Sequence, residues 1–358
     1  MTNSTALLAS LQREITARGW SRKPTGRVVL ELSFHLLVSL AGIAVFVASN
    51  NLLIRILAIL VSTYGTLGVA TNAHTSAHNA SSSKPWVNQL LASIGYPIFL
   101  GLSLSYWRNK HNVVHHPAPN VIGVDDDADL LPWFVMTQEE AARGGPVRQF
   151  YFRHIQWYLF PFALAANGFN VHRTGFTFLY RALRDPRRSR SHWIDLGCIV
   201  FFFVVWFAIP MMFFPVLKVL EFNLIRITLM GYAMFAAFAP AHFPADATRL
   251  HEAQRNADYL LVQTTGTINF KTGFFGRLVC SGVDYQIEHH LFPNVSHVFY
   301  PEMSPFIQDF CRENGLPYRT LGWGYAIWKC WDALRDLQPI HKNAEELRLR
   351  STTVSELS

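Results

Sequence analysis

Charged residues are scarce in this chain. Asp, Glu, Lys and Arg together make up 15% of its 358 residues, whereas a soluble domain usually carries about a quarter. Half of the residues are hydrophobic, and they include 28 Phe and 10 Trp. The composition therefore excludes an ordinary water-soluble domain and favours a membrane protein.

Motifs for a bound electron carrier are missing as well. No two of the four cysteines form a CxxC motif. The chain also has neither a GxGxxG loop nor a haem motif of the cytochrome b5 type. These absences exclude a ferredoxin-type cluster and a nucleotide-binding loop within the chain, and unpaired cysteines suit a reducing cytosol.

Long apolar stretches are what the chain does have. A helix that crosses a membrane needs about 20 consecutive, mostly apolar residues. Four stretches qualify, namely Leu32–Ser49, Leu52–Ala70, Leu196–Leu217 and Leu224–His242. We predict that they form two transmembrane hairpins, the first turning at Ser49–Asn51 and the second around Lys218–Asn223.

Basic residues lie outside these stretches. The segment before the first span contains five Arg or Lys, and the central loop contains RALRDPRRSR (Arg181–Arg190). The positive-inside rule then predicts that the large loops and both termini are cytosolic. Anionic lipid headgroups account for the net charge of +7. No basic stripe with interleaved aromatic residues occurs, so a nucleic-acid partner is not expected.

These patterns predict an all-α membrane protein with a cytosolic helical cap. We expect five segments in order: an amphipathic interfacial arm (1–31), the first hairpin (32–70), a first cap segment (71–195), the second hairpin (196–242) and a second cap segment with the tail (243–358). Within the arm, Ala6–Ile15 should lie on the membrane surface. Val87–Trp107 is interrupted by Gly and Pro and should be interfacial or re-entrant, and Tyr158–Phe169 is too short to span.

Histidine is concentrated in three short motifs near the ends of the apolar stretches. They read HTSAH, HNVVHH and QIEHH, and one further histidine closes the last span. A spacing of i to i+4 places two imidazoles on one helix face, where both can reach one metal. One structural zinc takes four ligands, so eight histidines predict two metals. The predicted ligands are His74, His78, His111, His115, His116, His242, His289 and His290.

Two other histidine-rich classes of membrane protein fit less well. A metal transporter would carry ionisable ligands near the middle of the membrane, within broken helices. A bis-histidine cytochrome would need paired histidines inside the spans, and His35 has no such partner. The transporter is kept as a remote alternative.

The histidine motifs resemble those of the membrane fatty acid desaturase family, whose three boxes read HxxxH, HxxHH or HxxxHH, and [HQ]xxHH. The resemblance runs from about Gly19 to Leu337. It is carried by RNKHNVVHHPAPNVIGVDDDADLLP, by QTTGTINF and by DYQIEHHLFPNVSHVFYPEMSPFIQDFCRENGLPY. Gln286 at the head of the third box is similar to the front-end and linoleoyl-CoA-like branch.

This resemblance implies a mushroom-shaped helical protein in which the eight histidines hold two irons, with zinc able to replace iron in purified protein. It implies an oxidoreductase that uses O2 to introduce a double bond into a fatty acyl chain. Gln286 stands where other branches have a ninth histidine, and Phe238 stands where stearoyl-type relatives have Asn. Further ligands, or groups that orient ligands, are expected among Gln286, Asp125, Asp127, Asn269 and His297.

The resemblance also implies the partners. The substrate is a fatty acyl chain carried by CoA, acyl carrier protein or phospholipid, and the electron donor is ferredoxin or cytochrome b5 with its reductase. Related membrane hydroxylases, acetylenases and carotenoid oxygenases use similar sites and stay open as alternatives. The sequence does not determine the double-bond position, the acyl carrier, the chain length or the oligomeric state.

Overall fold

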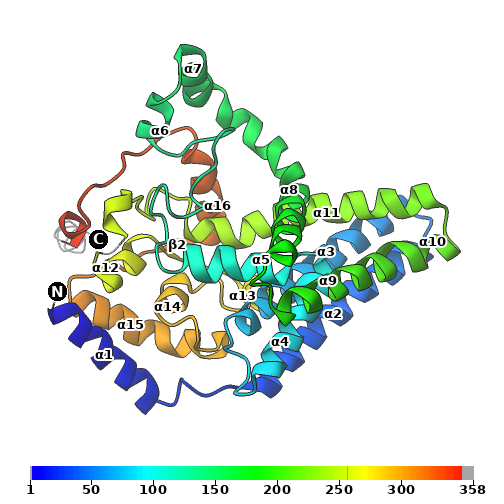
Figure 1. Cartoon of the computed structure of the whole chain (residues 1–358), viewed down its shortest axis with the longest axis horizontal. Coiled ribbons are helices and arrows are strands. Elements are labelled where there is room, and N and C mark those ends of the chain that lie inside the picture. Colours follow the sequence, from blue (N-terminus) through cyan, green and yellow to red (C-terminus); the bar gives the residue numbers. More distant parts are fainter. Residues whose placement is uncertain (1, 256, 349–358) are drawn as a thin grey trace.

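The computed structural model of the chain describes residues 2–255 and 257–348. Long apolar helices extend to one side of the molecule, and shorter helices and loops gather on the other (Figure 1). The prediction of a mostly helical fold is confirmed. One small departure is a two-stranded parallel sheet, in which β1 (Asn269–Lys271) pairs with β2 (Thr320–Gly322).

Four helical segments are long and apolar enough to cross a membrane. The first two are α2 (Thr25–Ala48) and α3 (Leu52–Ala77), which pack along each other. The side chain of Asn51 accepts a hydrogen bond from the backbone of Ile54 and so caps α3. At Gly65 a Cβ would lie 2.4 Å from the backbone of α2. Small residues therefore allow the close approach of these helices.

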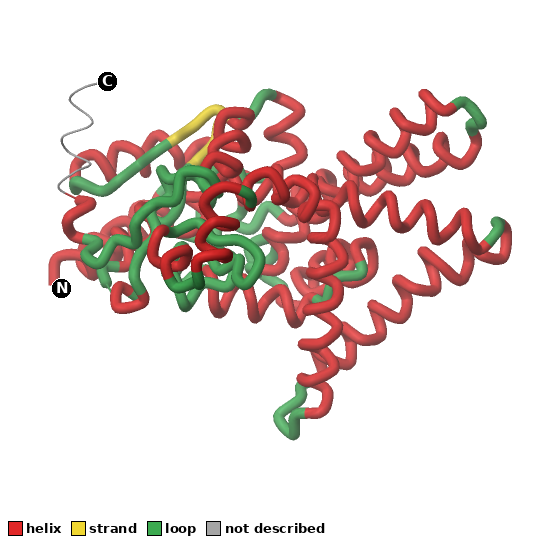
Figure 2. Tube along the Cα trace, turned by 90° about the horizontal axis from the view of Figure 1, so that it is seen from above, coloured by secondary structure: helices red, strands yellow, loops and turns green. Residues whose placement is uncertain are grey.

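The other two candidate spans are joined at a different place from the predicted one. α9 (Arg190–Phe203) continues through the π-helical turn η3 (Val204–Ala208) into α10 (Ile209–Phe213), and α11 (Val216–Phe238) follows. The turn expected around Lys218–Asn223 lies instead before α11. Pro215 precedes the first residue of α11, and proline lacks the backbone N–H that would continue α10. Figure 2 shows helices projecting in pairs from one side of the molecule.

The apolar stretch after α3 does not form a straight helix. α4 (Pro85–Ser93) runs into the π-helix η1 (Ile94–Leu100), and α5 (Leu104–Arg108) runs into the π-helix η2 (Asn109–His115). The chain bends by 116° between the two halves. Gly101 at the bend has φ 72°, a value that favours glycine. A bent pair of this kind is either a broken span or a re-entrant loop, so the interfacial or re-entrant position stays a prediction.

Of the two other segments predicted to be interfacial, only one differs in the structure. Tyr158–Phe169 is part of α8 (Gln156–Arg184), a helix of 29 residues that is not among the four candidate spans, so its interfacial position stays a prediction. The apolar face of α1 (Thr2–Ala17) does not lie free for lipid, because Leu11 and Ile15 are 1% and 2% exposed inside a hydrophobic cluster of the protein. An apolar stripe predicts burial, but the surface that buries it depends on the tertiary structure.

The remaining elements are shorter. They are α6 (Gln138–Ala142), α7 (Pro146–His154), η4 (Ala239–Ala241), η5 (Glu252–Gln254), α12 (Tyr259–Thr265), α13 (Phe274–Cys280), α14 (Gln286–Leu291), η6 (His297–Phe299), α15 (Tyr300–Glu313) and α16 (Trp323–Asp332). α14 contacts both α12 and α15. This packing holds the third histidine motif inside the molecule.

Candidate metal centre

Four separate regions of the chain deliver histidines to one place. They come from the end of α3, from the π-helix η2 and the residue after it, from the residue after η4, and from α14. Every one of the eight predicted histidines is buried, with at most 9% of its surface exposed. The structure thus brings together residues that are far apart in the sequence.

The ring nitrogens form two adjoining groups. In each group these nitrogens lie within 4.8 Å of one another. The first group is His74, His78, His111 and His289, and the second is His115, His242 and His290. The His116 ring stands between them, with its centroid 4.5 Å from that of His78 and 4.3 Å from that of His290.

The spacing of these nitrogens fits metal coordination. The Nε2 atom of His111 lies 2.9 Å from Nε2 of His74 and 3.1 Å from Nε2 of His116. Adjacent ligands on a metal, with metal–nitrogen bonds of about 2.1 Å, lie roughly 3 Å apart at right angles. Among the described residues, Nε2 of His78 and Nε2 of His289 are buried without a hydrogen-bond partner. Buried polar atoms rarely stay unpaired, so the donor set fits a bound metal.

Hydrogen bonds at the opposite nitrogens orient the two rings of α14. The Tyr300 hydroxyl donates to a backbone carbonyl, so it accepts from Nδ1–H of His289 at 3.2 Å. Nδ1–H of His290 donates to Oε1 of Gln263 at 3.0 Å. Each bond places the proton on Nδ1, so the lone pair of Nε2 faces the cluster, where a metal can use it.

Charge neutrality of the rings also favours metal binding. Burial lowers the pKa of His116, His289 and His290 well below the usual range, and neighbouring imidazoles lower it further. These rings are therefore neutral at physiological pH. Neutral imidazole is the form that binds a metal.

Asp125 orients His115, a member of the second group, through a hydrogen bond. Its carboxylate, 1% exposed, accepts from Nδ1–H of His115 at 2.9 Å and from the backbone N–H groups of Asn120 and Asp127. Burial alone would raise the pKa of Asp125, but His115 and the two N–H groups lower it to about 2. Asp127 is more exposed; it pairs with Lys110 at 2.7 Å and lies 3.8 Å from Nδ1 of His115.

Gln286 lies with the cluster. It is 1% exposed and shares one face of α14 with His289 and His290. Its Oε1 atom has no hydrogen-bond partner among the residues that the structure describes. The amide therefore has a free acceptor beside the ring nitrogens.

Asn269 and His297 take supporting positions. Asn269 donates to Glu288 at 2.8 Å and accepts from the backbone N–H of Ile287 at 2.9 Å, which holds the start of α14. Both nitrogens of His297 are engaged, one with Thr75 and one with Glu31, each at 2.7 Å. Neither residue belongs to the two groups of metal-facing nitrogens.

Sequence reasoning missed several residues that contact the histidines. Gln263 bonds to His290 and also donates to the backbone carbonyl of His116 at 3.0 Å. The centroid of the Trp107 ring lies 4.5 Å from that of His111. Phe238, which the resemblance had already singled out, has its ring centroid 5.7 Å from that of His74. Gln263 opens the QTTGTINF stretch, but its amide is not recognisable as a partner without the tertiary contact.

We expect replacement of Asp125 by asparagine to weaken metal binding by about 10- to 100-fold, the usual cost of losing the group that orients a ligand histidine. The amide can no longer offer two anionic oxygens to His115 and the two N–H groups. Metal retention against a graded chelator measures the effect. The neighbouring Asp126 is exposed, so Asp126→Asn is the matched control. Equal metal retention in both variants would contradict the role of Asp125.

Four apolar helices joined to a buried cluster of histidines define an integral membrane protein with a candidate metal site. The fatty acid desaturase family matches residues 50–322, which is well over half of the chain. The chain therefore belongs to the fatty acid desaturase family. It is an oxidoreductase that acts on fatty acyl chains, as the sequence predicted.

Curated relatives agree with this family. The sn-1 linoleoyl-lipid 6-desaturase of Synechocystis is 27% identical over 285 residues, which cover 75% of this chain and 76% of the relative. The corresponding enzyme of Arthrospira platensis is 24% identical, over 82% of this chain and 81% of the relative. The Delta(8)-fatty-acid desaturase 2 of Arabidopsis thaliana is 26% identical; it matches 71% of this chain, which spans 58% of that relative. These names support the front-end branch that Gln286 indicated.

Proposed function

We propose that the chain desaturates a fatty acyl group with O2 at a two-iron centre held by the eight clustered histidines. The proposal rests on the two adjoining groups of ring nitrogens. One group has four histidines and the other has three, and the His116 ring lies between them. Iron would supply the O2 activation that no protein side chain provides. The overall change converts –CH2–CH2– with O2, two electrons and two protons into –CH=CH– and two waters.

The protein's own residues hold and orient the ligands. Asp125, Gln263 and Tyr300 each accept an Nδ1–H from a ligand histidine. Burial of all eight rings keeps bulk water away from the metal-facing nitrogens. A rigid, dry donor set of this kind favours controlled oxidation of a bound chain over side reactions with solvent.

Two electrons per turnover come from a separate donor, ferredoxin or cytochrome b5 with its reductase. The chain contains no motif for an electron carrier of its own. The loop between α8 and α9 exposes Arg188, and Arg190 is exposed at the start of α9, while Arg187 pairs with Asp185 at 3.2 Å. A basic surface of this kind would attract an acidic partner protein.

The four candidate spans are proposed to form two transmembrane hairpins, with the histidines and both termini on the cytosolic side. The basic residues of the arm and of Arg181–Arg190 support this orientation. The five segments predicted above, with cap segments at 71–195 and 243–358, belong to the same proposal. Residue 1 and the C-terminal residues 349–358 lie outside the described residues.

Cysteine labelling tests this topology. In a Cys198→Ser background, we expect Val113→Cys and Asn294→Cys to react with an impermeant maleimide from the same, cytosolic side. Both positions are exposed and stand near the second and third histidine motifs, while the other three native cysteines are buried. Reaction of the two positions from opposite sides would refute a shared site.

Lipid analysis tests the reaction. We expect cells that produce the chain to accumulate an acyl group with one additional double bond, and cells that produce His290→Ala to lack it. A hydroxylated, acetylenic or oxidised carotenoid product would favour the related oxygenases instead. An unchanged lipid profile together with altered cellular metal content would favour the transporter.

A further inference from the structure

The bend that joins η1 to α5 is held by side chains from other helices. The last carbonyl groups of a helix have no partners within the helix, and away from water they need other donors. At the end of η1, three consecutive carbonyl groups accept hydrogen bonds from side chains of η3, α11 and α8. The three pairs are Trp206 with Ile98 at 3.2 Å, Arg226 with Phe99, and His172 with Leu100 at 2.8 Å.

Arg226 is the unusual member of this set. It stands near the middle of the candidate span Val216–Ala241 and is 5% exposed. Its guanidinium lies over the Trp206 ring, 3.7 Å from the ring centroid. Over residues 2–255 and 257–348, no carboxylate pairs with it. A buried charge inside a span is costly and usually serves function, and the partner of this charge is the backbone of Phe99.

A carboxylate holds the other side of the bend. Asp195 of α9 is 3% exposed and accepts hydrogen bonds from the Ser103 hydroxyl and from the backbone N–H groups of Leu104 and Ser105, at 2.7, 3.1 and 2.9 Å. The two charges suit the two helix ends. A helix carries partial negative charge at its C-terminal end, where Arg226 lies, and partial positive charge at its N-terminal end, where Asp195 lies.

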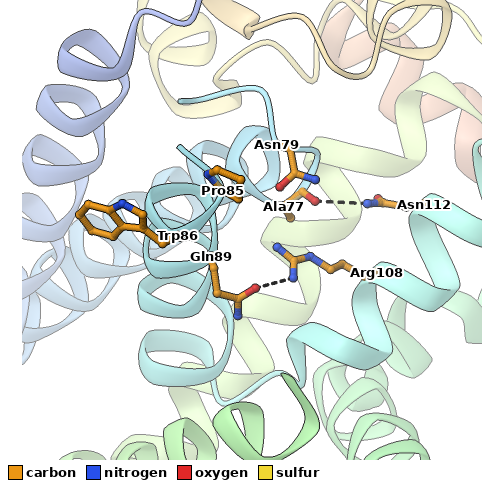
Figure 3. Close-up of a pocket in the computed structure, with 7 residues that line it drawn as sticks. All are labelled: Ala77, Asn79, Pro85, Trp86, Gln89, Arg108 and Asn112. Atoms are coloured by element: carbon orange, nitrogen blue, oxygen red, sulfur yellow. Dashed lines mark hydrogen bonds between the residues drawn. The ribbon is translucent and has the colours of Figure 1, made fainter. Parts of the chain in front are cut away.

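The opposite end of the bent pair is linked to α3. Nη1 of Arg108 donates to Oε1 of Gln89 at 2.6 Å and so joins the two arms. Asn112 in η2 donates to the carbonyl group of Ala77 at 3.2 Å. Figure 3 shows both bonds beside a polar cavity that these four residues help to line. The arm formed by α5 and η2 is therefore fixed to α3 near the histidines, and to α9 and α11 at the bend.

This arm carries the second histidine motif, which contributes to both nitrogen groups. His111 belongs to the first group and His115 to the second, and the His116 ring lies between the groups. A shift of the whole arm would therefore disturb both groups at once. Loss of a single ligand histidine would disturb only its own group.

We propose that Arg226 and Asp195 are positioning residues for the metal centre. They hold the two sides of the bend and thereby fix the place of the second histidine motif. The inference rests on the proposed two-metal site. It means that a pair of buried charges in the second pair of candidate spans controls how tightly both ions are held.

Metal release from Arg226→Met tests this role. Purified, metal-loaded protein is titrated with a graded chelator, and both ions are counted. We expect the affinity for both ions to fall about tenfold, because methionine leaves the buried carbonyl group of Phe99 unpaired. Arg226→Lys should restore part of the affinity, since an ammonium group also donates to a carbonyl. Arg55→Met is the matched control, because Arg55 likewise lies in a candidate span and over an aromatic ring, that of Phe46.

Hydrogen exchange tests the bend without reference to metal. We expect the backbone amides of Leu104 and Ser105 to exchange about tenfold faster in Arg226→Met, with or without bound metal, while the amides of α2 keep their wild-type rates. Asp195→Ala should give the same pattern, because it releases the other side of the bend. Asp185→Ala changes a carboxylate in the loop before α9 and is its control.

Weaker binding of both ions together with faster exchange at the bend supports the inference. Metal loss confined to one ion, or exchange at the bend equal to that of Arg55→Met, overturns it. If Arg226→Met fails to elute as the wild type does, Asp195→Ala and Arg226→Lys decide by the same two measurements. A wild-type protein that binds no metal would contradict the proposed function, while the exchange comparison would still decide whether Arg226 holds the bend.

Discussion

Replacement of His290 by alanine should abolish desaturation and release the metal ion of the second nitrogen group. The ring is fully buried, Gln263 fixes its Nδ1–H, and its Nε2 faces the second nitrogen group. Alanine removes one metal-binding nitrogen from a group of three, and the remaining two cannot hold the ion against solvent. Product analysis and metal analysis on the same preparation measure both effects.

Gln286→Ala provides the contrast. An amide oxygen is a weaker iron ligand than imidazole but can orient a neighbouring group through hydrogen bonds. We therefore expect this variant to keep much of its metal and to turn over more slowly. Near-normal activity of Gln286→Asn or Gln286→Ser would show that the residue only supports the start of α14. If Gln286→Ala loses metal as completely as His290→Ala, Gln286 is a ligand and the eight-histidine site is wrong.

Fully loaded protein should hold two transition-metal ions per chain, and single substitutions should remove them separately. His78 belongs to the first group of nitrogens and His242 to the second. We expect His78→Ala and His242→Ala each to lower the content from about two ions to about one, because each group loses one of its few nitrogens. Either loss should abolish activity, since the proposed chemistry uses both ions.

Metal analysis with zinc and iron counted together measures this stoichiometry, because zinc can occupy the sites in overproduced protein. His154 is exposed at the end of α7, so His154→Ala is the matched control and should keep both ions. X-ray absorption should show nitrogen ligands at each metal. One ion or none in fully loaded wild-type protein would contradict the two-metal site.

Local spacing made the membrane helices and the histidine motifs predictable. Four apolar stretches predicted the four candidate spans, because span length depends on the thickness of the membrane. His74 and His78 stand four residues apart and, as expected from one helical face, belong to the same nitrogen group. His111 and His115 have the same spacing, but they lie on the π-helix η2 and belong to the first and the second group respectively. The QIEHH motif similarly places Gln286 beside two histidines.

Errors in the predicted fold arose where neighbouring elements decide the outcome. Hydropathy alone did not separate the end of α10 from the start of α11, whereas Pro215 marks the boundary. The apolar stripe of α1 was assigned to lipid, but Leu11 and Ile15 are buried inside the protein. An apolar stripe in the sequence predicts that one face of the helix is buried. Only the tertiary structure shows whether lipid or protein buries that face.

The sequence by itself determined the class of protein and the spacing of the histidines. The tertiary structure decided how the histidines divide into two groups, with His116 between them. It also decided which residues orient the rings, such as Gln263 for His290, and placed Arg108 in a cavity beside them. The physical reason is that helix geometry is set by residues a few positions apart. Ligand orientation instead depends on contacts between residues far apart in the chain, which form only when the protein folds.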